Sequence, residues 1–174
     1  MLYTRKGDTG TSGLYGTKER VPKNSAVYEA LGGVDELNSL LGLCRASAEA
    51  QNEIARVLLE AQERLFILQA ELAGSGKVIS PADVLGLEDD IALFETRIRN
   101  PHAFVIPGAT VLSGMLDYAR AVARRVERVV VGLSAPRAAA AAARSYLNRL
   151  SSLLYVLARY AATLKGVKEA SPHY

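Results

Sequence analysis

The feature that most restricts the fold is the spacing of apolar residues in the last third of the chain. They recur at alternating intervals of three and four: Leu147, Leu150, Leu154, Leu157, Ala161 and Leu164. Side chains spaced in this way lie on one face of an α-helix. The alternation of three and four is also the seam along which helices pack in a left-handed bundle. The pattern therefore predicts a helix that buries one stripe against neighbouring helices.

Four earlier segments carry the same helical periodicity. They predict one helix from Ser25 onward and others at 52–73, 87–99 and 110–131. Residues 74–86 should form a loop. We expect Pro101 to end the third helix and Pro136 to begin the last one, because proline stops a helix but suits its first position. The alanine run at 138–143 should be helical as well, since alanine is the best helix former.

The expected fold class is therefore all-α, with five antiparallel helices in a left-handed bundle. At 174 residues and 49% hydrophobic, the chain is long and apolar enough for a single domain, 1–174. Polar, Gly-rich residues 1–24 should form an ordered loop ahead of the bundle at 25–165, and 166–174 a tail. The only strand-like stretch is 104–106.

The composition argues against several classes of protein. No apolar run approaches the roughly 20 residues that span a bilayer, and the start of the chain lacks the apolar core of a signal peptide. We therefore expect a cytoplasmic protein without a membrane partner. The single cysteine, Cys44, lies among apolar residues and favours a buried, structural thiol. The two histidines, His102 and His173, are not spaced as metal ligands. We expect neither a metal site made by protein side chains nor a protein nucleophile.

Glycine recurs at every third position of the N-terminal segment, at Gly7, Gly10, Gly13 and Gly16. Glycine lets the backbone approach a ligand closely and direct several N–H groups at an anion. Hydroxyl side chains stand between the glycines, and Arg5, Lys6 and Lys23 add positive charge. The segment is not a Walker A loop, because the nearest Gly-Lys pair, at 76–77, is followed by valine. The composition favours a phosphate-binding loop and a flexible polar tail about equally.

Arginines gather on one face of the 110–131 segment. Arg120, Arg124, Glu127 and Arg128 lie at i, i+4, i+7 and i+8, which spreads them over roughly 12 Å of one helical face. Guanidiniums this close repel one another unless an anion lies between them, and each can bind phosphate through two hydrogen bonds. A solvated surface with salt bridges is the alternative. The cluster is compact, without interleaved aromatics, and the net charge is only +3, so we expect no nucleic-acid partner.

Two polar clusters interrupt the apolar pattern of the helices. Asp35-Glu36-Leu37-Asn38 lies within the first helix, where Asp and Asn are poor helix formers. Asn148-Arg149-Leu150-Ser151 lies within the last. Each cluster could be an exposed face. Several such polar groups that point inward would instead build a site inside the bundle.

Taken in order, these motifs resemble the signatures of the PduO-type ATP:cob(I)alamin adenosyltransferases. The matching stretches are Thr4-Arg5-Lys6-Gly7-Asp8-x-Gly10, Val27-Tyr28-Glu29-Ala30-Leu31-Gly32-x-x-Asp35-Glu36-Leu37-Asn38, Phe104-Val105-Ile106-Pro107-Gly108, Arg120-x-x-x-Arg124-Arg125-x-Glu127-Arg128 and Asn148-Arg149-Leu150-Ser151. Each motif is short. Together they keep the family's order and spacing over nearly the whole chain, which makes the resemblance specific.

The resemblance implies a five-helix bundle that assembles as a homotrimer with active sites at the subunit interfaces. The implied reaction transfers the 5′-deoxyadenosyl group of ATP to Co(I) of cobalamin, giving adenosylcobalamin and triphosphate. Cobalt is then the nucleophile, which explains why no side chain needs to be one. Mg²⁺ would arrive bound to the ATP phosphates and need no protein cage. The implied partners are a cobalamin reductase that supplies Co(I) and an adenosylcobalamin-dependent mutase that takes the product.

The resemblance also implies roles for individual residues. The ATP triphosphate would be held by Thr4, Arg5, Lys6, Gly7, Ser12 and Lys23. The other wall of the ATP site, from the neighbouring subunit, would comprise Arg124, Arg125, Glu127, Arg128 and Asn148. Arg120 would pair with Asp35 across the interface. Phe104 would sit beneath the corrin and displace the lower cobalt ligand. The expected catalytic residues are Arg124, Glu127, Arg128 and Phe104.

The chain departs from the family pattern at two positions. Val126 stands where the family commonly has alanine, and Ser152 where it commonly has aspartate. If that aspartate supports corrinoid binding, the cobalamin half of the site differs in this chain. The alternative function is a protein that binds ATP and cobalamin for delivery or regulation without turnover.

Overall fold

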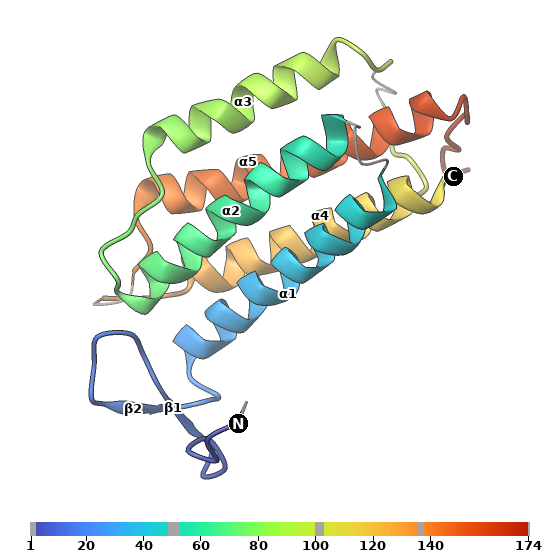
Figure 1. Cartoon of the computed structure of the whole chain (residues 1–174). Coiled ribbons are helices and arrows are strands. Elements are labelled where there is room, and N and C mark those ends of the chain that lie inside the picture. Colours follow the sequence, from blue (N-terminus) through green and yellow to red (C-terminus); the bar gives the residue numbers. More distant parts are fainter. Residues whose placement is uncertain (1–2, 49–52, 100–102, 136–137, 174) are drawn as a thin grey trace.

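The computed structural model describes residues 3–48, 53–99, 103–135 and 138–173. Within these ranges the chain forms five helices and two short strands (Figure 1). The helices are α1 (Ala26–Ser47), α2 (Glu53–Ala73), α3 (Pro81–Glu95), α4 (Val111–Val131) and α5 (Ala141–Leu164). The strands β1 (Thr11–Gly13) and β2 (Arg20–Pro22) pair antiparallel. The expected all-α, five-helix fold is confirmed.

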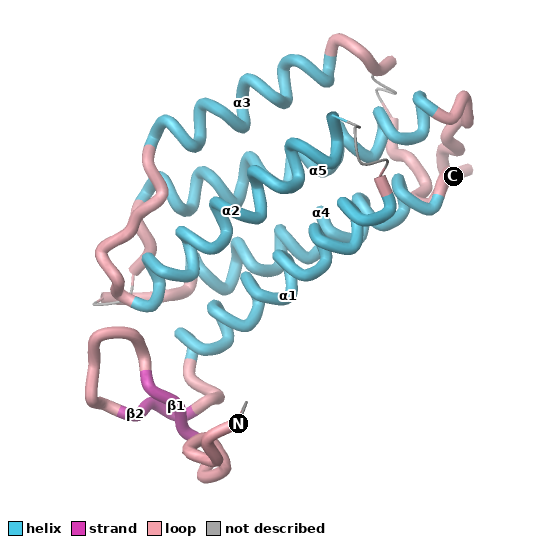
Figure 2. Tube along the Cα trace, in the orientation of Figure 1, coloured by secondary structure: helices cyan, strands magenta, loops and turns pink. Residues whose placement is uncertain are grey.

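The helices pack side by side, and their connections gather at the two ends of the bundle (Figure 2). α1 packs against α2 and α4, while α5 packs against α4 and α3. The predicted stripe of α5 lies in the core: Leu147, Leu150, Leu154, Leu157 and Ala161 are at most 3% exposed. Leu164, at the end of the helix, is 50% exposed. The seam is therefore confirmed for five of its six positions.

Glycines allow two close approaches of α1. A β-carbon at Gly33 would lie 3.3 Å from Cγ2 of Val126 on α4. A β-carbon at Gly42 would lie 3.1 Å from Nε2 of Gln62 on α2, the nitrogen that donates a hydrogen bond to the Asn38 carbonyl at 3.0 Å. The valine that replaces the family's usual alanine thus packs against a position where α1 has no side chain.

The third helix begins earlier than expected. It covers Pro81–Glu95 instead of 87–99, so residues 81–86 are helical and the prediction of a loop there was wrong. The cause is a capping box: the Ser80 hydroxyl accepts a hydrogen bond from the Asp83 N–H, and the Asp83 carboxylate accepts one from the Ser80 N–H at 2.8 Å. These two bonds satisfy N–H groups at the start of the helix. The expected terminator, Pro101, lies outside the described residues.

The fifth helix begins later than expected. Pro136 lies outside the described residues, and residues 138–140 precede the helix, although their alanines favour one. The N–H of Ala140 donates to the Glu71 carboxylate of α2 at 3.0 Å. Alanine has no side chain that can cap a helix, so this contact from α2 holds the backbone where α5 starts.

The strands also lie elsewhere than expected. Residues 104–106 form no strand. The Ile106 N–H instead donates to the carbonyl of Ala170 in the C-terminal tail at 2.8 Å. The hairpin β1–β2 lies in the N-terminal segment, where only a loop was expected. An apolar triplet forms a β-strand only when a second strand pairs with it, and the segment beside residues 104–106 is the irregular C-terminal tail.

The structural interpretation of the cysteine is confirmed. Cys44 is fully buried, and burial raises the pKa of its thiol to about 11. The thiol therefore stays protonated and unreactive at neutral pH. Among the described residues, no helix is both long and apolar enough to cross a membrane.

Candidate active site

The N-terminal segment folds around the β1–β2 hairpin. Arg20 holds it together: Nε donates to the Thr11 hydroxyl at 2.9 Å, and Nη2 donates to the carbonyls of Lys6 and Thr11. Ser12 pairs with Val21 at the centre of the hairpin. The segment is thus folded, as expected. The sequence analysis missed Arg20, whose role depends on a turn that places it opposite residues nine or more positions away.

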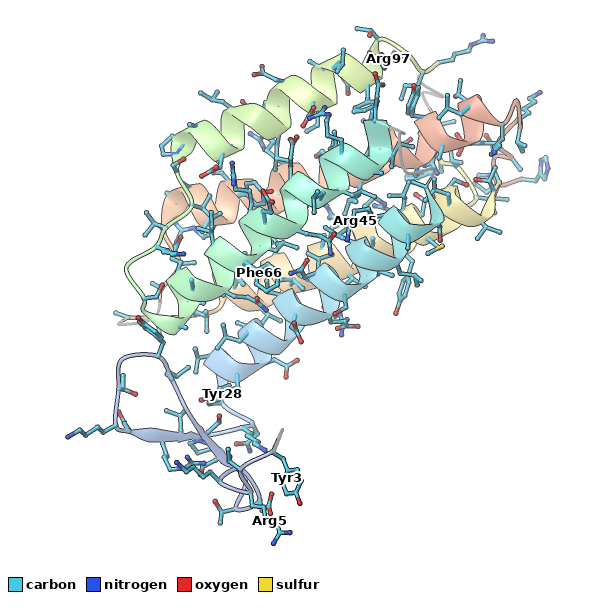
Figure 3. The ribbon with its side chains drawn as sticks, in the orientation of Figure 1. Tyr3, Arg5, Tyr28, Arg45, Phe66 and Arg97 are labelled. Atoms are coloured by element: carbon cyan, nitrogen blue, oxygen red, sulfur yellow. The ribbon has the colours of Figure 1, made fainter. Side chains whose placement is uncertain are left out.

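The backbone of this segment turns sharply at three positions, with positive φ at Arg5 (59°), Gly10 (76°) and Gly16 (70°). For arginine this conformation costs on the order of 1 kcal/mol. The ammonium of Lys23 lies against Gly7, where a β-carbon would be 2.9 Å from Nζ. Arg5 lies at the tip of the segment, away from the helices (Figure 3). Two expected site residues, Gly7 and Lys23, are therefore brought together. Thr4 and Lys6 are exposed, as Arg5 is.

Helix α4 presents the expected arginine face. Arg124 and Arg128 are exposed and Arg120 is half-buried. Arg128 Nη1 donates to the Arg124 carbonyl at 3.0 Å. The Arg124 side chain makes no hydrogen bond or ion pair with any residue that the structure describes, so it is available to a ligand. Arg125 lies about 100° further round the helix, where its guanidinium is 2.5 Å from the Glu36 carboxylate of α1. It therefore lies off the arginine face.

Two further expected site residues, Asn148 and Glu127, are hydrogen-bonded to each other where α5 packs on α4. Asn148 Nδ2 donates to Glu127 Oε1 at 3.0 Å. The amide oxygen of Asn148 accepts a hydrogen bond from Arg149 Nη1 at 2.7 Å. The sequence left open whether this polar cluster is an exposed face or points into the bundle. For Asn148 the second interpretation is correct, because its side chain contacts α4. Ser152, where the family commonly has aspartate, is exposed.

A pocket of about 720 Å³ adjoins the arginine face. Its walls come from the loop before α4, from α4 and α5, and from the tail, and include Phe104, Pro107, Asp117, Arg120, Tyr155 and Pro172. Phe104 is 76% exposed, so it is not a core residue, and an aromatic ring exposed beside a cavity is typical of a binding site. Arg120 lines the pocket and Arg124 follows one turn along α4. The pocket therefore meets the arginine face at Arg120.

A chain of buried charges, missed by the sequence analysis, forms part of the pocket wall. Arg159 Nη2 lies 2.5 Å from Asp117 Oδ2, and both side chains are at most 4% exposed. Arg159 Nε contacts Glu169 of the tail at 2.6 Å. Burial opposes the charge of Arg159, but its hydrogen bond and ion pair with Asp117 raise its pKa. The sequence did carry a signal, because Arg159 is a lone charge in an apolar stretch of α5.

The structure does not pair Asp35 with Arg120 within one chain. Asp35 is exposed on α1 and makes no ion pair with a described residue. Arg120 Nε lies 3.9 Å from Asp117 Oδ1, and this nitrogen is buried without a hydrogen-bond partner among the described residues. Pairing between subunits stays a prediction.

The N-terminal segment and the arginine face lie toward the same end of the bundle, where α1 begins and α4 ends (Figure 1). Within the described ranges, no hydrogen bond or ion pair joins residues 3–24 to α4 or α5. Within the described residues of one chain, the two candidate parts of an anion site are thus not joined by a hydrogen bond or an ion pair.

Residues 2–161 match the cobalamin adenosyltransferase family. The chain belongs to this family. A cobalamin adenosyltransferase of Cupriavidus metallidurans is 41% identical over 159 residues, covering 91% of this chain and 86% of the relative. The corrinoid adenosyltransferase PduO of Salmonella typhimurium is 40% identical over 166 residues, covering 91% of this chain but 48% of the relative. The chain therefore spans about half the length of the Salmonella protein.

Solved structures of adenosyltransferases share the fold. A variant of the PduO-type ATP:corrinoid adenosyltransferase from Lactobacillus reuteri, complexed with cobalamin and ATP, superposes with a TM-score of 0.92 at 29% identity. The superposition covers 99% of this chain and 97% of the other. The resemblance inferred from the motifs is confirmed. The family match ends at residue 161, so Glu169 and the rest of the tail lie beyond it.

Proposed function

We propose that this chain transfers the 5′-deoxyadenosyl group of ATP to Co(I) of a corrinoid such as cobalamin, giving adenosylcobalamin and triphosphate. One observation carries the proposal: the pocket beside Phe104 meets the arginine face of α4 at Arg120. A partly apolar cavity next to an anion-binding face suits a large planar substrate beside a triphosphate. The family, and a related structure that holds both cobalamin and ATP, support the assignment.

In the proposed reaction the electron pair of Co(I) attacks C5′ of ATP. A Co–C bond forms while the C5′–O bond breaks, and the bonding pair leaves with the triphosphate. Holding both reactants in line removes much of the entropic barrier. Negative charge grows on the leaving oxygen, where Arg124 and Arg128 can stabilise it. Lys23 and the backbone N–H of Gly7 would hold the remaining phosphates.

The residues present fit a Mg²⁺ ion carried by ATP. Glu127 Oε1 accepts the hydrogen bond from Asn148, whereas its Oε2 accepts none from a described residue. Mg²⁺ usually takes one or two carboxylate oxygens and completes its shell with phosphate oxygens and water. The free Oε2 of Glu127 would add one oxygen to the shell of an ion that the ATP phosphates already hold, so no cage of protein side chains is needed, and the ion would neutralise part of the triphosphate charge.

The proposal includes a homotrimer whose sites lie between subunits. The phosphate loop of one subunit would then meet the arginine face of the next. Two observations among the described residues support this arrangement: no hydrogen bond or ion pair joins the two parts within one chain, and the exposed Asp35 on α1 makes no ion pair. Wild-type protein should sediment as a trimer at catalytic concentrations, and a fully active monomer would contradict the shared site.

Arg120→Ala should weaken the trimer and ATP binding together. The lost pair with Asp35 should cost on the order of 1 kcal/mol per interface, because the Arg120 side chain is 36% exposed and solvent screens the interaction. Asp35→Asn should cause a similar loss. Asp89→Asn, at an exposed carboxylate on α3, is the control and should change neither. Sedimentation and ATP titration of the same samples test the prediction, and a normal trimer in Arg120→Ala would refute the pairing.

Phe104→Ala should separate catalysis from packing. A lower axial ligand makes Co(II) hard to reduce, and an apolar ring can exclude it without coordinating cobalt. The variant should fold normally, because a ring that is 76% exposed lacks the packing whose loss costs about 3–5 kcal/mol. It should fail with Co(II) and a mild reductant, yet keep partial activity with preformed Co(I).

The matched control for this variant is Phe66→Ala, at a phenylalanine on α2 that is 63% exposed (Figure 3). It should behave as the wild type in both assays. Equal losses of Phe104→Ala with both cobalt states, together with a lower melting temperature, would show that the ring only packs.

The function itself is tested by mixing the protein, ATP and chemically reduced cobalamin. The Co(I) absorption spectrum should change to that of adenosylcobalamin. A protein that binds both compounds and leaves the spectrum unchanged would be a delivery or regulatory protein instead.

A further inference from the structure

Four polar side chains connect α3 to the nucleotide site. Glu88 of α3 accepts a hydrogen bond from Arg149 Nε at 2.8 Å, and Arg149 Nη1 donates to Asn148 Oδ1 at 2.7 Å. Asn148 Nδ2 then donates to Glu127 of α4 at 3.0 Å. Arg149 belongs to the Asn148-Arg149-Leu150-Ser151 motif, but it is part of neither the arginine face nor the pocket wall.

Arg149 determines what the Asn148 amide can offer to a ligand. An asparagine amide has one oxygen acceptor and two N–H donors. Here the oxygen faces a guanidinium and one N–H faces a carboxylate, so a reversed amide would meet repulsion on both sides. Asn148 is left with one N–H for a ligand, and Glu127 with one carboxylate oxygen. The site therefore presents a donor beside an acceptor.

We propose that Arg149, anchored by Glu88, is a positioning residue of the nucleotide site that acts through Asn148. The inference rests on the proposed function only in taking ATP as the ligand. Without Arg149, the broad terminal torsion of asparagine lets the amide rotate, and Oδ1 competes for the ligand. Lysine cannot replace arginine, because one ammonium cannot reproduce the planar fork that contacts Glu88 and Asn148 together.

The first test titrates ATP into the full chain without corrinoid, so that binding is measured apart from turnover. Arg149→Ala and Arg149→Lys should each weaken ATP binding about tenfold, the typical effect of losing a hydrogen bond to a charged group. In the complete reaction KM for ATP should rise and KM for the corrinoid should not. The control is Arg56→Ala on α2. Arg56 also reaches α3, through Asp90 at 3.3 Å, but its hydrogen bonds go to Glu60 and Asp90 and not to Asn148. It should bind ATP as the wild type does.

The second test is a double-mutant cycle. If Arg149 acts through Asn148, then Arg149→Ala should add nothing to the loss caused by Asn148→Ala. Glu88→Gln, which removes only the charge that anchors Arg149, should give a smaller loss that also vanishes in the Asn148→Ala background. The Glu88→Gln variant keeps the test valid if Arg149→Ala does not fold.

Additive losses in the cycle, or wild-type ATP affinity in Arg149→Ala, would overturn the proposal. A wild-type chain that binds no ATP would overturn both this inference and the proposed function. A chain that shows the expected cycle but forms no adenosylcobalamin would refute the function alone.

Discussion

Replacing Arg124 by alanine is expected to slow adenosylcobalamin formation by about 10²-fold, the usual cost of losing one electrostatic contact to a transition state. Arg124 is exposed on α4, and its guanidinium binds no described residue. Nothing in the fold therefore depends on it. In the proposed reaction, the charge of Arg124 would stabilise the leaving triphosphate as the C5′–O bond breaks. The melting temperature should stay unchanged while single-turnover rates fall.

Two companion variants make this result specific. Arg124→Lys should recover little activity, because an ammonium cannot form the two parallel hydrogen bonds that guanidinium makes with phosphate. Arg45→Ala removes another exposed helical arginine, on α1, and should turn over at the wild-type rate. Wild-type turnover in Arg124→Ala would remove this residue from the mechanism. The same logic applies to Arg128, whose contact with its own helix predicts a smaller loss.

Arg159→Ala is expected to lower the free energy of unfolding by about 3–5 kcal/mol, since it leaves the buried carboxylate of Asp117 without its partner. For a chain of this size the melting temperature should fall by roughly 10 °C at a fixed protein concentration. Glu169 loses its contact as well, so the tail should exchange its amide protons faster. Calorimetry and hydrogen exchange measure the two effects.

The ion pair between Arg159 and Asp117 is itself expected to contribute much less than about 3–5 kcal/mol to the free energy of unfolding. Replacing both partners, as in Asp117→Leu with Arg159→Met, should recover most of the lost stability, because no buried charge then remains. As a control, Arg97→Ala removes the exposed ion pair with Glu53 and should lower the free energy of unfolding only slightly, because solvent screens the pair. A loss that small in Arg159→Ala would mean that water reaches Asp117.

The sequence predicted the helices where their packing is periodic. The stripe of α5 follows directly from the spacing of its leucines, and only Leu164, beyond the packed region, departs from it. The start of α3 was missed because its signal is a cap, Ser80 with Asp83, and not apolar spacing. The start of α5 depends on Glu71, which lies about 70 residues earlier and has no local signature.

The same distinction applies to the candidate site: local spacing predicted some of its residues, and only the fold brings the others together. The arginine face could be derived from the intervals between Arg120, Arg124 and Arg128, because helical geometry alone places them together. The contact between Glu127 and Asn148 joins two helices, and only the family resemblance pointed to it. The group of Asp117, Arg159 and Glu169 draws on α4, α5 and the tail. The apolar stretch of α5 marks Arg159 alone, but no local pattern connects it to Asp117 and Glu169, so only the fold reveals the group.

If one site transfers the 5′-deoxyadenosyl group of ATP to cobalt, the most direct test is the stoichiometry of the two products. With chemically reduced cobalamin and excess ATP, the protein should release one triphosphate for each adenosylcobalamin formed. Release of ADP and phosphate instead, or adenosylcobalamin formed without triphosphate, would contradict the account.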